Sequence, residues 1–225
     1  ALVGPVAEKM WVATFHSACV RILRRSADRL DYPSGFTIYD QADAVRLTGY
    51  VLRDLNIDPK RFTLRSVHSA ISATKNDLIS PDEYLGLVTT PPEKRIAEVY
   101  REYQVRLQRA GAMDFDDLLV NAVRLFQRNP DVLAEYQRRF RHVLVDEYQD
   151  TNRAQNELIV LLGKEHRNVC VVGDSDQSIY KFRGADIRNI LEFEEAFPDA
   201  TVIVLEQNYR STQTILDAAN AVIAN

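Results

Sequence analysis

The stretch VLVDEYQDTN, residues 143–152, decides the expected fold, because an apolar run ends there in two adjacent carboxylates. Val143, Leu144 and Val145 are typical of a short buried strand. Asp146 and Glu147 follow directly, with a polar run behind them. Such an ending suits either an acidic turn or a site for a metal ion and a water molecule. Other parts of the sequence are needed to distinguish the two.

The bulk composition is that of an ordinary globular chain of 225 residues, 46% hydrophobic and 27% charged. A net charge of −4 gives no global nucleic-acid signal, so any DNA contact has to come from a local patch. Cys19 and Cys170 stand alone without a spacing motif, which favours a reducing compartment over a disulfide framework. The sequence has no secretory leader and no apolar run of about 18 residues, so we expect a cytoplasmic protein without membrane contact.

The last third of the chain alternates short β-branched runs with helical patterns. The runs are HVLVDE (142–147), VCVVGD (169–174) and TVIVLE (201–206). Helical patterns cover 154–162 and 187–197, between the runs. This alternation predicts an α/β fold with a parallel sheet and helices on both of its faces. WVATF (11–15) is expected to be a further strand of the same sheet.

The middle of the chain is predicted to be helical. A helix is expected over about 17–30, then a short extended piece FTIYD (36–40), then a helix capped by Asp40. Helical patterns continue from about 66 to 140. Proline and glycine residues mark the expected joints between helices, at Pro81, Pro91–Pro92, Gly111 and Pro130.

The helical stretch 40–110 is therefore expected to be an insertion between residues 1–39 and 111–225. Four basic residues in it are expected on a solvated face, with contact to duplex DNA as the alternative: Lys60, Arg61, Arg65 and Lys75.

Each late strand ends in residues that are capable of chemistry. Asp146 and Glu147 follow the first strand, residues 173–177 (GDSDQ) the second, and residues 206–210 (EQNYR) the third. Ligands of open parallel sheets bind outside the carboxyl ends of the strands. Any one of these ends alone is typical of a solvated loop, but three on one edge favour a site.

The residue types fit nucleoside triphosphate chemistry. Asp146 can hold Mg²⁺, and the adjacent Glu147 can orient the attacking water. Gln177 can hydrogen-bond a γ-phosphate or water, and Arg210 can neutralise charge on the transferring phosphoryl group, as an arginine finger does. The P-loop pattern G-x-x-x-x-G-K-[ST] does not occur, and Gly163–Lys164 is expected to be a helix C-terminus.

An aromatic and basic run, SIYKFRGA (178–185), follows the expected γ-phosphate sensor. Tyr180 and Phe182 offer ring faces for base stacking, and Lys181 and Arg183 can meet phosphates. The alternative is structural, with Phe182 in the core and the two cations on a solvated flank.

Six segments resemble signature segments of superfamily 1 DNA helicases of the UvrD/Rep/PcrA type, in the same order. They are TFHSACVRILRR (14–25), AISATKNDLI (70–79), MDFDDLL (113–119), DEYQDTNRAQ (146–155), VVGDSDQSIYKFRGADIRNIL (171–191) and LEQNYRST (205–212). The resemblance covers essentially the whole chain, and long motifs in order are far more specific than any single short pattern.

The resemblance implies a RecA-like first motor domain of the P-loop NTPase type, formed by residues 1–39 and 111–225 and interrupted by a helical subdomain at 40–110. The family's phosphate loop is expected upstream of Ala1 and its second motor domain beyond Asn225. We therefore expect a piece of an ATP-dependent DNA helicase for repair or replication, inactive when isolated.

The resemblance also assigns roles around the nucleotide. It places Asp146 at the Mg²⁺ position, Glu147 at the catalytic base, Gln177 at the γ-phosphate sensor, Arg210 at the arginine finger and Tyr209 on the adenine. ATP and Mg²⁺ are the implied cofactors.

On the DNA side, the resemblance implies base stacking by Tyr180 and Phe182, where many members have Trp at the second position. Arg183 is expected close to the nucleotide, and Thr14, Phe15 and His16 lie in a segment that contacts DNA in the family. The implied partners are single-stranded DNA, single/double-strand junctions, and repair or replication proteins, in a nucleoid-associated, bacterial cytoplasmic setting.

Two alternatives come from other classes of function. A metal-dependent nuclease would use two ions among the carboxylates Asp146, Glu147, Asp150 and Asp174. A non-catalytic module would bind single-stranded DNA or dock a partner, with salt-sensitive binding and no effect of nucleotide.

Overall fold

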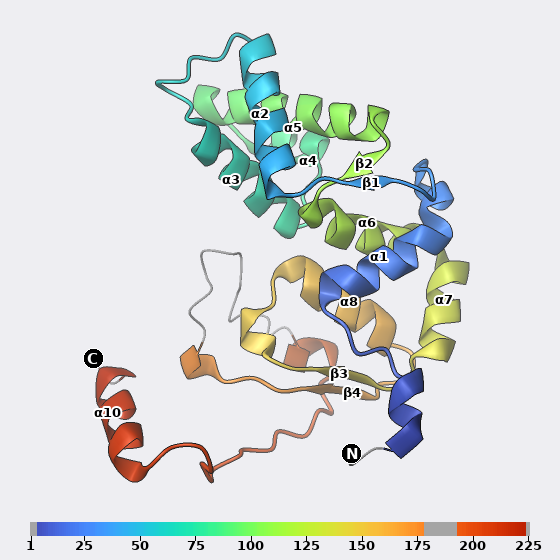
Figure 1. The fold of residues 1–225 in the computed structure, drawn as a ribbon, viewed down its shortest axis with the longest axis vertical. Coiled ribbons are helices and arrows are strands. Elements are labelled where there is room, and N and C mark those ends of the chain that lie inside the picture. Colours follow the sequence, from blue (N-terminus) through green and yellow to red (C-terminus); the bar gives the residue numbers. More distant parts are fainter. Residues whose placement is uncertain (1–3, 178–192, 224–225) are drawn as a thin grey trace.

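Helices dominate the computed structural model, which describes residues 4–177 and 193–223 (Figure 1). The α-helices are α1 (Phe15–Ser26), α2 (Gln41–Asp54), α3 (Leu64–Asn76), α4 (Pro81–Leu87), α5 (Pro91–Arg109), α6 (Phe115–Arg128), α7 (Pro130–Arg139), α8 (Arg153–Gly163) and α10 (Gln213–Ile223). The 3-10 helices are η1 (Gly4–Lys9), η2 (Ala27–Leu30), η3 (Tyr148–Asp150) and η4 (Ser175–Gln177). In these described ranges, no helix is both long and apolar enough to cross a membrane.

Within the described part of the chain, four short strands form two parallel pairs. The strands are β1 (Thr37–Ile38), β2 (Ala112–Met113), β3 (Val143–Val145) and β4 (Val169–Val171). β1 pairs with β2, and β3 pairs with β4. The chain is therefore a mixed α/β protein with small parallel sheets.

Side-chain caps explain where the middle helices begin. Asp40 accepts a hydrogen bond from the backbone N–H of Asp43 at 2.8 Å, as expected for the cap of α2. Ser80 and Thr90 each form a capping box with a glutamate three residues later, and a proline follows each of them at the first helical position. The expected helices of the middle of the chain and their proline joints are confirmed.

Helices α2–α5 form a layer with its own apolar cluster, at the top of Figure 1. The buried members of this cluster all lie between residues 44 and 112, and they include the fully buried Tyr100 and Tyr103 of α5. The chain enters this layer after β1 and leaves it just before β2, and Thr37 pairs with Ala112 at that point. One strand pair therefore joins both ends of the layer.

Helix α6 is the centre of the molecule, because α1, α3, α7 and α8 all pack against it. The largest apolar cluster forms here, from α1, η2, α6, α7 and the start of α8. The approach to α6 depends on Gly111, which has φ +58° and lies against Pro33. Any other residue at this position would have a strained backbone conformation, and its Cβ would lie too close to the Pro33 ring.

The β3–β4 pair lies below these helices, with Val143 opposite Val169 and Val145 opposite Val171. Side chains alternate across the pair: Val145 is buried in a third apolar cluster with Tyr148 and Ile159 of α8, whereas Leu144 is 71% exposed. Among the described residues, only one face of this pair is covered, and residues 187–192 of the expected helix 187–197 lie outside them.

The expected strand WVATF (11–15) is not formed, because residues 11–14 have no strand conformation and Phe15 begins α1. Thr14 accepts a hydrogen bond from the backbone N–H of Ser17 and so caps the helix. Trp11 packs edge-on against Phe140 at 5.0 Å between ring centroids. A local helix cap and an aromatic contact outweigh the weak strand propensity of a five-residue run.

The expected strand TVIVLE (201–206) is also wrong, because these residues pair with no strand and Leu205 is 83% exposed. Strand propensity describes how well a side chain fits a half-buried pleated surface, and a segment needs a neighbouring strand to realise it. Figure 1 shows this segment running away from β3–β4 towards α10.

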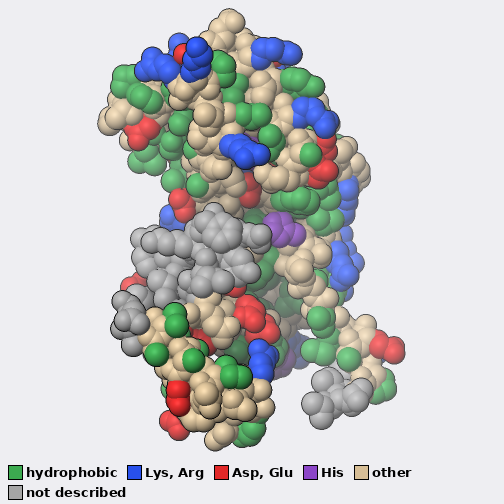
Figure 2. Space-filling model, turned by 60° about the vertical axis from the view of Figure 1, so that its left-hand side comes forward, with side chains coloured by type: hydrophobic (Ala, Val, Ile, Leu, Met, Phe, Trp, Pro, Cys, Tyr) green, Lys and Arg blue, Asp and Glu red, His purple; other side chains and the backbone are tan. Residues whose placement is uncertain are grey.

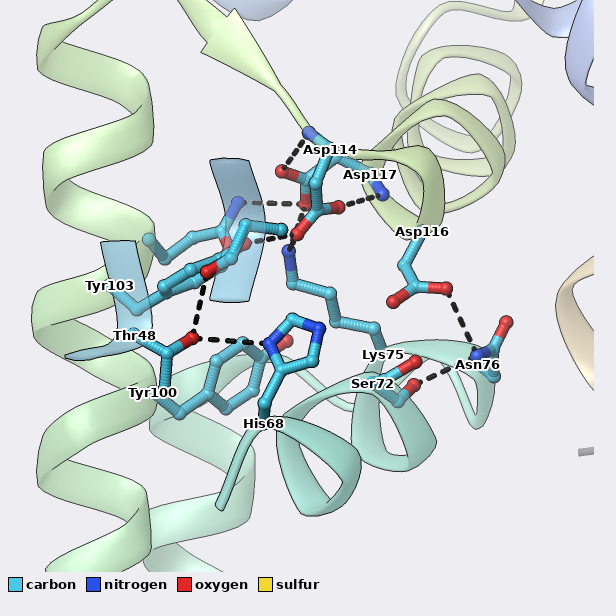
Figure 3. A network of polar contacts seen from close by, with 12 residues as sticks. Thr48, His68, Ser72, Lys75, Asn76, Tyr100, Tyr103, Asp114, Asp116 and Asp117 are labelled. Atoms are coloured by element: carbon cyan, nitrogen blue, oxygen red, sulfur yellow. Dashed lines mark hydrogen bonds and ion pairs between the residues drawn. The ribbon is translucent and has the colours of Figure 1, made fainter. Parts of the chain in front are cut away.

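Lys75, in the last turn of α3, has a buried side chain that is only 1% exposed. Its Nζ donates to Asp114 Oδ2 at 2.7 Å and to Asp117 Oδ1 at 2.8 Å, as Figure 3 shows. The expectation of a solvated face or a duplex contact is therefore wrong for Lys75. The reason is that α3 points this cation at the acidic start of α6.

The pKa values of the two carboxylates around Lys75, those of Asp114 and Asp117, are shifted in opposite directions. Tyr103 donates to Asp114 at 2.7 Å and Gln104 donates to Asp117 at 2.8 Å. Burial and the neighbouring Asp114 raise the pKa of Asp117 to about 6. Lys75 and the Tyr103 hydroxyl keep the pKa of Asp114 below its usual value despite its burial.

The other three basic residues of that group, Lys60, Arg61 and Arg65, are exposed as expected. Figure 2 shows Lys and Arg side chains on the outside of the upper, helical part of the molecule.

Candidate functional site

Asp146 and Glu147 lie at the carboxyl end of β3, as expected, and both are exposed. Val145 anchors the strand end in the third apolar cluster, and Tyr148 fills the same cluster from the other side of the two carboxylates. The backbone N–H of Tyr148 donates to the carbonyl of Val172 at 2.9 Å, so the ends of β3 and β4 stay together beyond the regular pair.

Glu147 adopts a left-handed backbone conformation, with φ 52° and ψ 44°. For a residue other than glycine this conformation costs on the order of 1–3 kcal/mol and persists only where the surroundings impose it. Glu147 itself is exposed, whereas the two residues that follow it, Tyr148 and Gln149, are buried. Strain of this kind is typical of functional sites.

The side chain of Gln149 connects the ends of the two strands. It is 1% exposed. Its Nε2 donates to Glu147 Oε2 at 2.7 Å, and its Oε1 accepts from the backbone N–H of Asp174 at 3.0 Å. One buried amide thus contacts the carboxylate that follows β3 and the loop that follows β4.

Gly173 permits this close approach. A Cβ at this position would lie 2.9 Å from Gln149 Oε1 and 3.3 Å from the Gln149 backbone nitrogen. Any larger residue would therefore push the loop after β4 away from Gln149.

The loop after β4 is organised by Asp174. Its Oδ1 accepts from the backbone N–H of Asp176 at 3.0 Å, and its Oδ2 accepts from Gln177 Nε2 at 2.7 Å. The side chain of Gln177, the expected γ-phosphate sensor, is therefore held by the residue that also contacts Gln149. A continuous series of hydrogen bonds runs from Glu147 through Gln149 and Asp174 to Gln177.

The polar residues after Glu147 fix the segment to its neighbours. The Thr151 hydroxyl donates to the carbonyl of Tyr148 at 2.7 Å, and the Tyr148 hydroxyl donates to Asn156 of α8. Asn152 caps α8 and donates to Asn76, at the end of α3, at 2.6 Å. The segment of the site thus contacts the helical layer directly.

Asp146 has the donor chemistry that Mg²⁺ prefers. Its Oδ1 accepts from the backbone N–H of Glu147 at 3.0 Å, and its other oxygen accepts no hydrogen bond from the described residues. Mg²⁺ usually takes one or two protein carboxylates and completes its shell with water and substrate phosphates. An exposed carboxylate with one open oxygen fits that role.

Several expected site residues are not brought together with Glu147. Tyr209 is 93% exposed in the segment before α10, and Arg210 is exposed beside it. Tyr180, Phe182 and Arg183 lie outside the described residues.

The expected DNA-contacting residues Thr14, Phe15 and His16 lie at the start of α1. Thr14 is exposed, and Phe15 packs between the first and third apolar clusters. The His16 ring lies edge-on to the half-exposed Phe115, with 6.0 Å between ring centroids, and partial burial lowers its pKa. Partial burial thus favours the neutral form of the His16 ring.

The nuclease alternative finds no support in the part of the chain that the structure describes, because no group of three or more His, Cys, Asp or Glu side chains there is arranged to hold a metal ion. Asp174 is engaged with its own loop, and so it does not join Asp146 and Glu147 as a further ligand.

Sequence reasoning missed Gln149 and the organising role of Asp174. The available signal was a glutamine two residues after the expected catalytic base, in the polar run that follows the strand. Its contact with Asp174 spans 25 residues and could not be read from local patterns.

Comparison with known proteins gives consistent matches. Residues 1–198 match the UvrD/REP helicase N-terminal domain. The ATP-dependent DNA helicase PcrA of Bacillus subtilis (strain 168) is 50% identical over 224 residues, which is 100% of this chain and 30% of that protein. The ATP-dependent DNA helicase PcrA of Staphylococcus aureus (strain Mu50 / ATCC 700699) is 53% identical over 224 residues, which is 100% of this chain and 31% of that protein.

The protein of the same name from Staphylococcus epidermidis is 52% identical over 222 residues, covering 99% of this chain and 30% of that protein. The chain therefore spans about 30% of the length of these curated relatives. Since the domain match covers residues 1–198 of the 225, the chain belongs to the UvrD/REP helicase family.

Proposed function

We propose that this chain is part of an ATP-dependent DNA helicase, in which the ends of β3 and β4 form the nucleotide site. The observation that carries the proposal is the hydrogen-bonded series from Glu147 to Gln177, because it links a carboxylate suited to water with an amide suited to a γ-phosphate. The similar proteins of Bacillus subtilis and Staphylococcus aureus are named ATP-dependent DNA helicase PcrA, which supports the same activity.

Glu147 orients the attacking water and accepts its proton during hydrolysis. Its exposed carboxylate is held at one oxygen by Gln149, which leaves the other oxygen for the water. Asp146 would hold Mg²⁺, which would neutralise phosphate charge when bound. Asp146 thus serves the metal ion, and Glu147 serves the water.

Gln177 senses the γ-phosphate from the loop after β4. In the nucleotide-bound protein, Arg210 acts as the arginine finger and Tyr209 stacks on the adenine. The segment that carries both residues runs away from β3–β4 towards α10 (Figure 1), so it must approach the ends of these strands for these roles. Closure of this kind is common in enzymes that exclude water from phosphoryl transfer.

Single-stranded DNA contacts the run after the sensor and the start of α1. Tyr180 and Phe182 stack on bases, and Arg183 lies towards the nucleotide. Thr14, Phe15 and His16 contribute to the same strand. Lys60, Arg61 and Arg65 belong to a solvated face, with contact to the duplex side of a single/double-strand junction as the alternative. The whole protein would act with repair or replication proteins at the nucleoid.

Residues 1–39 and 111–225 form a RecA-like motor domain, and residues 40–110 form an inserted helical subdomain. Two observations support this division. The β1–β2 pair joins the chain immediately before and after the insertion. The apolar cluster of α2, α3 and α5 is made almost entirely from residues within it.

The proposal is tested by ATP hydrolysis and strand separation with the full-length protein that contains this chain. We expect Mg²⁺-dependent hydrolysis that rises at least about tenfold with single-stranded DNA, together with ATP-dependent unwinding of a tailed duplex. Salt-sensitive binding of single-stranded DNA without ATP hydrolysis would contradict the proposal and favour the non-catalytic alternative.

A further inference from the structure

We propose that Gln149 is a positioning residue for hydrolysis: it fixes the carboxylate of Glu147 and ties its orientation to the sensor loop after β4. The proposal rests on the proposed function, since it assigns a task in hydrolysis to a buried residue that contacts Glu147 and Asp174. It deepens that function by naming the connection between the water-orienting carboxylate and the γ-phosphate sensor.

The orientation of the Gln149 amide follows from its partners. A backbone N–H can only donate a hydrogen bond, so the atom of Gln149 that faces Asp174 N–H, 3.0 Å away, must be the oxygen. The NH₂ group then faces Glu147 Oε2, 2.7 Å away, where a carboxylate oxygen can only accept. Both ends of the amide are matched, and a flipped amide would lose both bonds.

This contact restricts a side chain that would otherwise be free. Glu147 is exposed, and a glutamate on a surface samples many rotamers. A hydrogen bond from a side chain with 1% exposure to one carboxylate oxygen removes most of that freedom. The carboxylate is therefore held ready for water before ATP arrives, which is the kind of pre-organisation that accelerates a chemical step.

The same amide connects Glu147 to the sensor. Asp174 donates its backbone N–H to Gln149 and accepts from the side chain of Gln177. A γ-phosphate that binds the side-chain amide of Gln177 competes with the Asp174 carboxylate for that amide. Once Asp174 has lost this bond, its position relative to Gln149 can change. The position of Glu147 thereby depends on whether the sensor is engaged, with Gly173 leaving the room for this contact.

The proposal separates two kinds of variant. Gln149→Glu keeps the volume and the oxygen that faces Asp174, but it replaces the NH₂ donor with an oxygen that repels Glu147. Gln149→Met keeps the approximate volume and loses both hydrogen bonds. Gln155→Glu is the matched control, because Gln155 contacts the backbone N–H of Asn152 only through its oxygen, at 2.9 Å, and glutamate retains that contact.

The experiment measures steady-state ATP hydrolysis by the full-length protein at saturating single-stranded DNA, and the affinity for a fluorescent ATP analogue. For Gln149→Glu we expect kcat to fall by about tenfold to a hundredfold, with the nucleotide Kd within about threefold of the wild type. Gln149→Met is expected to lose kcat in the same range. Gln155→Glu is expected to keep kcat within about twofold.

Three outcomes would overturn the proposal. An active wild type with an equally active Gln149→Glu variant would remove the positioning role while the proposed function stands. Equal loss of kcat and of nucleotide affinity in both folded Gln149 variants, checked by thermal melting, would mean that Gln149 only supports the fold. A wild type without DNA-stimulated hydrolysis would overturn the proposed function, and this proposal with it.

Discussion

Glu147 combines an exposed carboxylate with a left-handed backbone conformation. Its neighbours explain why the conformation persists: Val145 and Tyr148 are buried on either side of the two carboxylates, and the backbone N–H of Tyr148 donates to the carbonyl of Val172, just after β4. The structure thus holds one strained residue between two buried residues, and the strain places the carboxylate at the strand end.

A comparison of two substitutions tests this strain. Both Glu147→Gly and Glu147→Ala remove the carboxylate, but only glycine adopts a positive φ without steric cost. We expect the glycine variant to be more stable than the alanine variant by about 1 kcal/mol, in the opposite order to ordinary positions. Urea unfolding of the two variants measures the difference, and a more stable alanine variant would contradict the assigned conformation.

The sequence allowed part of this site to be predicted. Asp146, Glu147 and Gln177 were identified because each follows a β-branched run, and the structure joins the last two of them through hydrogen bonds. Gln149 was not identified, since its partner Asp174 is far away in the sequence. Pattern rules act over a few residues, whereas a buried amide is explained only by the two elements that it connects.

At the scale of elements, the buried Lys75 joins three helices. It lies in α3, its carboxylate partners begin α6, and Tyr103 of α5 shares one of them (Figure 3). Removing one partner of such a cluster leaves a charge buried without compensation, which typically costs 3–5 kcal/mol, to order of magnitude. The packing of the helical layer on α6 therefore depends on this cation.

Lys75→Met is predicted to destabilise the protein by about 3–5 kcal/mol near neutral pH. The loss should shrink as pH falls, because the pKa of Asp117 is already raised to about 6 by burial and by Asp114, so that a proton can replace the missing cation. Lys60→Met is the control, since Lys60 is an exposed member of the same layer. Thermal melting across pH measures the effect, and an equal loss at low and neutral pH would argue against buried carboxylates as its cause.

The elements also show where sequence patterns succeed. Helices α2–α7 were predicted because caps and prolines are local signals, such as the Asp40 cap and the proline that opens α5. The strands at 11–15 and 201–206 were wrong, because a strand depends on a neighbour elsewhere in the chain. At 11–15 a helix cap prevails, and at 201–206 the described structure offers no partner.

At the scale of the whole molecule, the site and the helical layer are in direct contact. Asn152, which caps the helix after the site, donates to Asn76 at the end of α3. Lys75, the residue before Asn76, is locked to the start of α6. One side-chain hydrogen bond therefore connects the segment that follows β3 to the layer that carries the exposed basic residues.

The central claim is that Glu147 serves hydrolysis rather than nucleotide binding. The most direct measurement compares the full-length wild type with Glu147→Gln, a nearly isosteric change, in single-turnover ATP hydrolysis with single-stranded DNA and in nucleotide binding. We predict that Glu147→Gln binds the nucleotide about as tightly as the wild type and hydrolyses it at least about a hundredfold more slowly. Hydrolysis at the wild-type rate would contradict the assignment of Glu147 and, with it, the site proposed at the ends of β3 and β4.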